Sequence, residues 1–366
     1  MRIGLVGGIF GRSAEHRAIH RHTPETTLAR GLAALGHRVD TLGHEEPIRS
    51  EQYDVIHVHH VGRAAYWMAT SPRVVPFVFT GHDAMMLSGF EENPLRRAAF
   101  REVVHRCDAA VALSHAEAGF LQGFARPPRV EVIPNGIPAE AYQATSLDGA
   151  PERRGLVFAG QLIPMKGVET LLRAMALLQG RRGLKLTLAY HNPELEQPLQ
   201  KLAAELGLAE VVRFAGPQTP AQLAQLYRGA EAFVLPSYAE SLPSVITEAL
   251  LAGTPVVSTT VGGIREQVGE FGALVPPGDP SALAQALEHV LDHPPALERR
   301  QAMREHALAR SSPSAMVEAH LRLYESLVSK SRSVPRRGQR LDPALRAAIW
   351  AYWGFGKAAL GRTTPA

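Results

Sequence analysis

Short apolar runs alternate with amphipathic segments along most of this chain, and that alternation restricts the fold more than any other feature of the sequence. The first half has such runs at 3–6, 39–42, 55–58, 75–79 and 109–113. The second half repeats the pattern at 156–159, 184–188, 211–214, 233–235 and 256–258. Strands that alternate with helices form parallel β/α units. The sequence therefore predicts an α/β protein built from two Rossmann-like β/α/β domains.

The 366 residues are enough for two domains of ordinary size. We expect an N-terminal domain over 1–140, a linker over 141–154 where the composition loosens, a C-terminal domain over 155–329, and a tail over 330–366. Three helices are expected near the end of the second domain, over 282–291, 296–309 and 314–327. The last of them is expected to lean back toward the first domain.

A single cysteine, Cys107, rules out an internal disulfide framework and suits a reducing compartment. Its apolar surroundings favour a buried structural thiol over a nucleophile. The N-terminal sequence MRIGLVGGIF lacks the pattern of a cleavable signal peptide. No apolar stretch reaches the ~20 residues that a membrane-spanning helix needs. These features predict a cytoplasmic protein.

Basic charge is concentrated in residues 330–366, where eight Lys or Arg and one Asp give a net charge of 8 − 1 = +7. The rest of the chain carries +4 − 7 = −3, which argues against a nucleic-acid groove in the body of the protein. Aromatic residues on this cationic segment suit peripheral contact of 340–357 with the inner, anionic face of a membrane. The pattern favours packing of the segment against the same protein or a partner over this membrane contact. Disorder and nucleic-acid binding are less favoured.

The stretch from 232 to 263 carries the strongest chemical signal in the sequence. A buried strand over 232–235 precedes a polar turn. Ser241 is then expected to cap a helix that has Pro243 in its first turn and ends at Gly253. In an open α/β sheet such a turn lies at the edge where ligands bind. The N-terminus of the helix that follows suits a phosphate group.

Two carboxylates, Glu240 and Glu248, bracket this turn. Neither can approach a pyrophosphate without repulsion, so each is expected to accept hydrogen bonds from sugar hydroxyls; the alternative is a loop acid and a solvated helix residue. The stretch resembles the Glu-x7-Glu signature of retaining GT-B glycosyltransferases of family 4. This resemblance implies that Glu240 contacts the transferred sugar and that Glu248 contacts the nucleotide ribose. It also implies that Ser241 and Leu242 lie beside the donor diphosphate.

The first turn of the second half, GQLIPMKG (160–167), resembles the Gly-Arg-Leu…Lys-Gly motif of the same family. Arg and Lys clamp the donor phosphates in that family, so the resemblance implies this role for Lys166, which can act as a point charge. Gln161 replaces the Arg and is expected to make only a weak polar contact next to Gly160. The resemblance also implies that Gly216 lies beside the nucleotide base.

A second resemblance to family 4 enzymes is the segment Thr-Gly-His-Asp at 80–83, which follows an expected strand. It is similar to their Thr-x-His-Asp segment, in which the His reaches the transferred sugar. The resemblance implies that His82 lies at the reacting centre. Asp83 is expected either on the acceptor side or as a cap of the following segment.

Three histidines, His57, His59 and His60, lie at the carboxyl end of another expected strand. Alternation along the strand puts His57 and His59 on one face. They could ligate a metal, but no carboxylate or cysteine is near them in sequence, so structural packing or a place in the acceptor site is favoured. Gly11 and Arg21, in the loop after the first strand, are also expected on the acceptor side.

Taken with these motifs, the resemblance implies a GT-B enzyme whose two domains face each other across a cleft, with the acceptor bound by the first domain and the nucleotide sugar by the second. We expect a retaining hexosyltransferase that uses a UDP- or GDP-sugar and an unknown glycan, lipid or small-molecule acceptor, in glycan, polysaccharide or glycolipid biosynthesis. The chain has no Asp-x-Asp motif, so no metal and no cofactor are expected. The alternatives are a nucleotide-sugar epimerase of the same fold and a non-catalytic nucleic-acid or membrane-surface binder that uses the tail.

Overall fold

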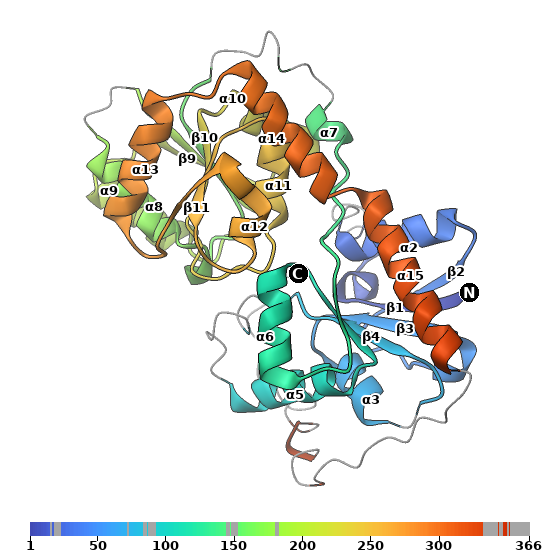
Figure 1. Cartoon of the computed structure of the whole chain (residues 1–366). Coiled ribbons are helices and arrows are strands. Elements are labelled where there is room, and N and C mark those ends of the chain that lie inside the picture. Colours follow the sequence, from blue (N-terminus) through green and yellow to red (C-terminus); the bar gives the residue numbers. More distant parts are fainter. Residues whose placement is uncertain are drawn as a thin grey trace. The chain divides into compact units, whose positions relative to one another are not determined.

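The computed structural model describes residues 1–14, 17, 23–71, 73–82, 86, 93–143, 147, 153–179, 183–331, 343, 347–349 and 351. It divides the chain into two units (Figure 1), of which unit 1 comprises Met1–Gly136 and Pro313–Ala366 and unit 2 comprises Ile137–Ser312. Each unit contains a six-stranded parallel sheet with helices on both faces. The predicted α/β fold with two Rossmann-like domains is therefore confirmed.

The sheet of unit 1 has the strand order β2-β1-β3-β4-β5-β6. Its strands are β1 (Arg2–Val6), β2 (Arg38–Leu42), β3 (Val55–His59), β4 (Phe77–Thr80), β5 (Ala109–Ala112) and β6 (Val130–Val132). The order changes direction between β1 and β3, so the topological switch point, where open α/β sheets bind ligands, lies at the carboxyl ends of these two strands. The sequence did not predict β6, which is an edge strand of half-buried residues and has a glutamate, Glu131, at its centre.

Two layers of helices bury the two faces of this sheet. One layer contains α3 (Arg63–Thr70), α5 (Pro94–Arg106) and α6 (His115–Ala125). The other contains α2 (Pro24–Ala34) and α15 (Pro313–Ser331), which lie side by side (Figure 1). The helix α2 begins as its sequence predicts, because Pro24 occupies the first turn and the Thr23 side chain accepts a hydrogen bond from the Thr26 N–H.

The helix α15 belongs to unit 1 although it follows unit 2 in the sequence. Its apolar residues Val317 and Tyr324 are buried in one core with Leu28 of α2. The two helices approach so closely that a Cβ atom at Gly31 would overlap Val317. The units therefore divide at 136/137 and 312/313, which differs from the expected ranges, because this helix buries its apolar face on the first sheet.

Of the tail, the structure describes residues 343, 347–349 and 351. Ile349 is fully buried in the core on the α3, α5 and α6 side of unit 1. At this residue the tail packs against its own unit. The remainder of the expected membrane-contact segment 340–357 lies outside the described residues.

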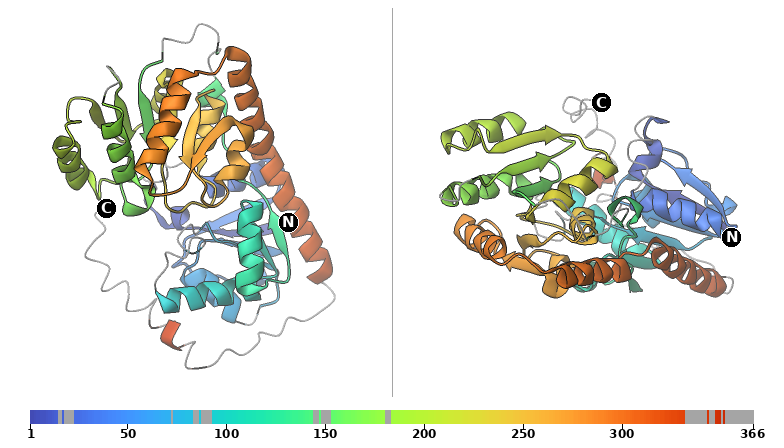
Figure 2. Two further views of the ribbon diagram at one scale, coloured as in Figure 1. Left: turned by 60° about the vertical axis from the view of Figure 1, so that its left-hand side comes forward. Right: turned by 90° about the horizontal axis from the view of Figure 1, so that it is seen from above.

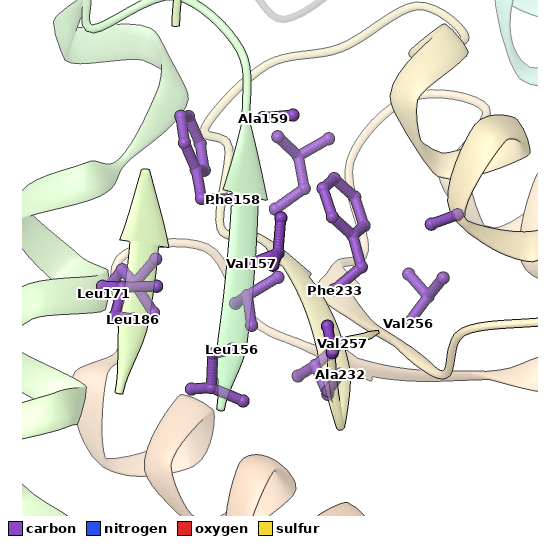
Figure 3. Close-up of a cluster of buried hydrophobic side chains, with 14 of the residues drawn as sticks. Leu156, Val157, Phe158, Ala159, Leu171, Leu186, Ala232, Phe233, Val256 and Val257 are labelled. Carbon is purple, nitrogen blue, oxygen red and sulfur yellow. The ribbon is translucent and has the colours of Figure 1, made fainter. Parts of the chain in front are cut away.

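The sheet of unit 2 has the order β12-β11-β10-β7-β8-β9, which is the order 3-2-1-4-5-6 of a doubly wound fold when the strands are counted from β7. Its strands are β7 (Leu156–Ala159), β8 (Leu186–Ala189), β9 (Val212–Gly216), β10 (Ala232–Leu235), β11 (Val256–Thr259) and β12 (Gly272–Val275). Figure 3 shows the buried core, in which Phe158 of β7 and Phe233 of β10 are completely inaccessible. The switch point lies between β7 and β10.

Helices cover both faces of this second sheet, as the further views in Figure 2 show. On one face, α8 (Val168–Leu177) packs against α9 (Glu196–Glu205) and α13 (Pro280–Asp292). On the other, α11 (Ser244–Leu251) packs against four helices, α7 (Glu140–Gln143), α10 (Pro220–Gly229), α12 (Ile264–Val268) and α14 (Leu297–Arg310). Within the described residues, no helix combines the length and apolar character needed to cross a membrane.

The start of α11 differs from the expected one. Pro243 is the N-cap and Ser244 the first helical residue, so a cap at Ser241 with Pro243 inside the first turn is wrong. The reason is that the Ser241 carbonyl accepts a hydrogen bond from the Gly263 N–H at 2.8 Å, which holds Ser241 in the preceding loop. The end of the helix is as predicted, because Gly253 adopts φ +65° and the Gly253 and Thr254 N–H groups bond back to the last turn.

Candidate functional site

The switch point of unit 2 brings Lys166 and Glu240 together. Lys166 closes the short η3 helix (Pro164–Lys166) after β7, and Glu240 lies in the loop after β10. The Lys166 Nζ atom lies 2.6 Å from Glu240 Oε1, and only 16% and 6% of the two side chains are exposed. The Ser237 hydroxyl donates to the same carboxylate oxygen at 2.7 Å. A lysine and a glutamate 74 positions apart thus form a largely buried, charge-assisted ion pair.

Close backbone approaches hold the loop after β10 against the loop after β7. The Tyr238 N–H donates to the Met165 carbonyl at 2.8 Å. Gly167 has φ +66°, and a Cβ atom there would overlap the carbonyl oxygen of Pro236. Only glycine combines this backbone conformation with so close a contact. The Lys-Gly pair of the sequence motif therefore supplies both the charge and the space that the loop requires.

The other side of the same loop rests on the turn after β11. The Thr259 hydroxyl donates to the Ser237 carbonyl at 2.7 Å. Gly262 has φ +55°, and a Cβ atom there would overlap the carbonyl oxygen of Glu240. The position of Glu240 is therefore set by backbone contacts with two neighbouring loops, which are rigid supports for a binding group.

Glu248 is the fifth residue of α11 and is partly buried. Its Oε2 atom accepts a hydrogen bond from the Tyr227 hydroxyl at 3.1 Å, and the Tyr142 hydroxyl also bonds to this carboxylate. Burial raises the pKa of Glu248 above its ordinary value, and the two tyrosine bonds offset only part of that effect. The sequence did not indicate either tyrosine, because each lies on a different element from Glu248.

The other donor-side residues lie at the same carboxyl edge of the sheet. Gly160 follows β7 directly, and the Gln161 side-chain nitrogen lies 3.3 Å from the ring Nε2 of His191 after β8. Gly216 ends β9 with φ +65°. Ser241 is buried, and Leu242 next to it is partly buried. The predicted residues Gly160, Gln161, Lys166, Gly216, Glu240, Ser241, Leu242 and Glu248 therefore come from one edge of one sheet.

The switch point of unit 1 holds a group of stacked histidines. His57 and His59 share one face of β3, as alternation predicts, with ring centroids 4.2 Å apart. The His57 ring nitrogens bond to the Tyr324 hydroxyl at 2.6 Å and to the Thr80 hydroxyl at 2.8 Å. His320 of α15 stacks on His57 with centroids 5.4 Å apart, and its Nδ1 bonds to the Met316 carbonyl at 2.8 Å. His57 is thus a structural histidine of the core.

His82 follows β4 and adopts φ +48°, a strained conformation for a residue other than glycine. Its Nε2 atom lies 3.0 Å from His59 Nδ1, and its ring also packs near that of His60. Burial lowers the pKa of His82 to about 3, with the nearby His60 contributing. Burial likewise holds the pKa of His59 well below its ordinary value, so both rings are neutral at pH 7.

Glu25 is the member of this group that the sequence did not indicate. It is the second residue of α2, is 5% exposed, and lies 3.1 Å from His60 Nε2 through its Oε1 atom. Burial by itself raises the pKa of Glu25, but the His60 hydrogen bond and the neighbouring histidines outweigh it and hold the pKa well below its ordinary value. A Glu in the first turn of a helix that follows β1 is the signal that could have identified it.

Of the remaining predicted residues, Gly11 ends the η1 helix (Gly8–Gly11), where its backbone lies so close to Gly43 that a Cβ atom at Gly43 would come within 2.8 Å of the Gly11 Cα. Arg21 and Asp83 lie outside the described residues. Cys107 is buried, and its Sγ atom donates to the Val104 carbonyl at 3.1 Å. Burial raises the pKa of this thiol to about 12, which agrees with the structural role predicted for it.

Family models match both halves of the chain. The family model described as "Glycosyl transferases group 1" matches residues 147–310, and the model described as "Glycosyltransferase Family 4" matches residues 45–141. The D-inositol 3-phosphate glycosyltransferase of Mycolicibacterium smegmatis is 35% identical over 302 residues, which cover 77% of this chain and 69% of that protein. The protein of the same name from Frankia alni is 36% identical over 270 residues, 66% of each chain.

Solved structures that are similar in fold include the following two. Sucrose-phosphate synthase from Thermosynechococcus elongatus superposes with a TM-score of 0.74 at 21% identity and covers 90% of this chain and 100% of its own. Anabaena Alr3699/HepE, solved in complex with UDP-glucose, superposes with a TM-score of 0.69 at 21% identity and covers 89% and 100%. At these identities the likeness concerns the fold, and it confirms the predicted GT-B architecture.

Proposed function

Because the chain belongs to the glycosyltransferases of group 1 and family 4, we propose that it moves a hexose from a UDP- or GDP-sugar to an acceptor hydroxyl with retention of the anomeric configuration. The observation that carries this proposal is the Lys166–Glu240 pair at the switch point of unit 2, with Glu248 in the helix that follows. This edge of a doubly wound sheet is where nucleotides bind.

The leaving diphosphate is assigned to Lys166 and the N-terminus of α11. The N-cap residue of that helix, Pro243, makes no side-chain capping bond, and the partial positive charge at the helix N-terminus favours an anion. Lys166 is held by Glu240, and a diphosphate would share the ammonium group with that carboxylate. As the glycosidic bond breaks, charge grows on the diphosphate, and each 1.4 kcal/mol of added stabilisation gives about a tenfold gain in rate.

The two glutamates are assigned to hydroxyl groups. Glu240, which Ser237 holds in place, accepts from a hydroxyl of the transferred sugar. Glu248 accepts from the nucleotide ribose. A carboxylate has about four lone-pair sites, so it can accept from Tyr142, Tyr227 and a ribose hydroxyl at once.

We assign the acceptor side to unit 1, where His82 contacts the transferred sugar. Its neutral imidazole suits a hydrogen bond and not a charge interaction. The acceptor hydroxyl attacks on the face that the diphosphate leaves, and the departing phosphate oxygen takes the hydroxyl proton. In this scheme Lys166 and the helix N-terminus carry the charge that a divalent ion carries in enzymes with an Asp-x-Asp motif.

Among donors we favour a UDP-sugar, because a protein of the same fold was solved with UDP-glucose. For the acceptor, the relatives named D-inositol 3-phosphate glycosyltransferase make a phosphorylated polyol the first candidate to assay. A hydroxyl of a glycan, polysaccharide or glycolipid follows. Contact of the tail with a membrane surface would suit a lipid acceptor.

The test begins with calorimetric titration of the full chain with UDP, GDP and ADP. Glu248→Gln is expected to weaken binding of the preferred nucleotide, while the exposed Glu194→Gln serves as the matched control and leaves it unchanged. His82→Ala is expected to lower turnover with little change in nucleotide affinity. Proton NMR of the product then gives the anomeric configuration. Conversion of the donor to its epimer without an acceptor, or transfer at the parental rate by both variants, would contradict the proposal.

A further inference from the structure

Three potential metal ligands meet at the switch point of unit 1. Glu25 comes from the first turn of α2, His59 from the end of β3 and His82 from the turn after β4. Each offers one ligand atom, and these atoms all lie within 4.8 Å of one another. We propose that Glu25, His59 and His82 form a binding site for a borderline divalent transition metal ion of the Zn²⁺ class.

The donor set selects this class of ion. Two imidazole nitrogens and one carboxylate oxygen suit zinc and its neighbours, whereas Mg²⁺ prefers oxygen ligands alone. Zinc binds such atoms at about 2.0–2.2 Å in tetrahedral geometry, so two ligand atoms on one ion lie about 3.3–3.6 Å apart. A separation of up to 4.8 Å therefore requires an approach of at most about 1.5 Å, which side-chain rotations provide. Three protein ligands also leave a coordination position for water or substrate.

An unpartnered nitrogen of His59 is the second observation that indicates a ligand. His59 is 3% exposed, and its Nε2 atom has no hydrogen-bond partner among the described residues. A buried polar atom without a partner costs about 1–3 kcal/mol, so native cores rarely contain one. The adjacent His57 shows the contrast, because both of its ring nitrogens are bonded to hydroxyl groups. His57 is fixed as a core residue, whereas His59 has coordinating capacity that no described side chain uses.

The surroundings of the three residues resemble the outer shell of a metal site. His60 bonds to Glu25 at 3.1 Å and so orients the carboxylate. Outer partners of this kind fix the orientation of the metal ligands and tune their affinity for the ion. The sequence argued against a metal because no carboxylate stands near His59 in the chain. The fold removes that objection, because the β1–β3 pairing brings the loop and helix after β1 beside the end of β3.

A bound ion would engage His82, so we expect it to inhibit glycosyl transfer. That consequence rests on the proposed function, whereas metal binding does not. The test therefore measures the metal directly and is independent of activity.

The experiment uses the full chain, stripped with a chelator and desalted. The exposed i,i+4 pair His289 and His293, whose rings lie 4.6 Å apart, is first changed to Asn because such a pair binds metals on its own. Calorimetric titration with ZnCl₂ is expected to show one site in this background. CoCl₂ is expected to give the visible absorption of cobalt with nitrogen and oxygen ligands.

Single substitutions in the same background then assign the ligands. We expect Glu25→Gln and His59→Gln each to abolish zinc binding or to weaken it strongly. Loss of an outer partner lowers metal affinity about 10–100-fold, and these two substitutions are expected to lower it further than that. His60→Gln, which removes only the outer partner, is expected to fall within that range. The exposed His105→Gln is the matched control and is expected to bind zinc like its parent.

Two results would overturn the assignment. One is the absence of a stoichiometric zinc site once the surface pair is removed. The other is parental affinity in both Glu25→Gln and His59→Gln. Circular dichroism and thermal unfolding establish whether each variant is folded. If one of the two variants does not fold, the other variant and the cobalt spectrum together decide the test.

Discussion

The Lys166–Glu240 pair allows a quantitative test of the site in unit 2. The substitution Lys166→Met keeps most of the aliphatic stem and removes the ammonium group. At an effective dielectric constant of about 20, two unit charges 2.6 Å apart attract by roughly 6 kcal/mol. Desolvation offsets much of this attraction in the intact pair, but removing one partner of a buried pair costs about 3–5 kcal/mol because the other charge is left uncompensated.

Two consequences are expected for Lys166→Met. The Glu240 carboxylate, 6% exposed, keeps the Ser237 hydroxyl as a partner, so we expect a loss near the lower end, about 3–4 kcal/mol of unfolding free energy. For a unit of this size that corresponds to roughly 6–16 °C in Tm. UDP affinity is expected to fall roughly 10–150-fold, since a hydrogen bond to a charged group contributes about 1.5–3 kcal/mol.

The assay must report on unit 2 specifically. All three tryptophans, Trp67, Trp350 and Trp353, belong to unit 1, so tryptophan fluorescence would follow the wrong half of the chain. Hydrogen exchange of unit 2 peptides and urea unfolding followed by circular dichroism are suitable. Lys185→Met, at an exposed position of the same unit, is the control and is expected to change stability by less than about 0.5 kcal/mol.

A double variant separates the lost pair from a general packing defect. Lys166→Met combined with Glu240→Gln removes both charges and is expected to recover part of the stability lost in the single variant. It is not expected to recover nucleotide binding. If Lys166→Met is as stable as the Lys185→Met control, or if the double variant is less stable than the single one, the argument from an uncompensated buried charge is refuted.

Three further predictions concern other parts of the molecule. Tyr142→Phe removes one donor to Glu248 and is expected to weaken binding of UDP more than that of 2′-deoxy-UDP; equal losses in titration would show a purely structural role. Burial lowers the pKa of His320 from 6.5 to about 4, so its contribution to stability is complete above pH 6.5 and is lost as the pH falls toward 4. His320→Leu is expected to flatten that dependence in urea unfolding, and an unchanged slope would contradict it. Gly119 and Gly123 lie in α6 with nothing near their missing Cβ atoms, so each Gly→Ala is expected to stabilise the protein by about 0.5–1 kcal/mol, and a lower Tm would refute this.

The fold could be predicted from the sequence because its signals are local. Each apolar run named in the two halves overlaps a strand of the structure, and Thr23-Pro24 opens a helix as its capping chemistry requires. Two kinds of error remained in the predicted elements. The strands β6 and β12 were not predicted, and both are edge strands whose residues are mostly half-buried. Ser241 was displaced from its capping role by a bond to a distant loop.

Only part of the site in unit 2 could be predicted from the sequence. Residue spacing and motif resemblance identified Lys166, Glu240 and Glu248, because in each case a strand, a turn and a helix start follow one another in the chain. They did not indicate that Lys166 and Glu240 form a pair, nor that Tyr142 and Tyr227 hold Glu248. The first contact depends on β7 and β10 being neighbours in the sheet, and the second depends on the packing of α11 against α7 and α10.

By itself, then, the sequence determined the kind of elements, their order and the family motifs, since hydrophobic period and turn chemistry act over a few residues. Only the tertiary structure decided which loops meet. Strand order places the carboxyl ends of β1, β3 and β4 together. It thereby brings Glu25 beside His59, 34 residues later, and His82, a further 23 residues later. Strand order results from packing of the whole core, to which every buried side chain contributes, and no short segment of the chain encodes it.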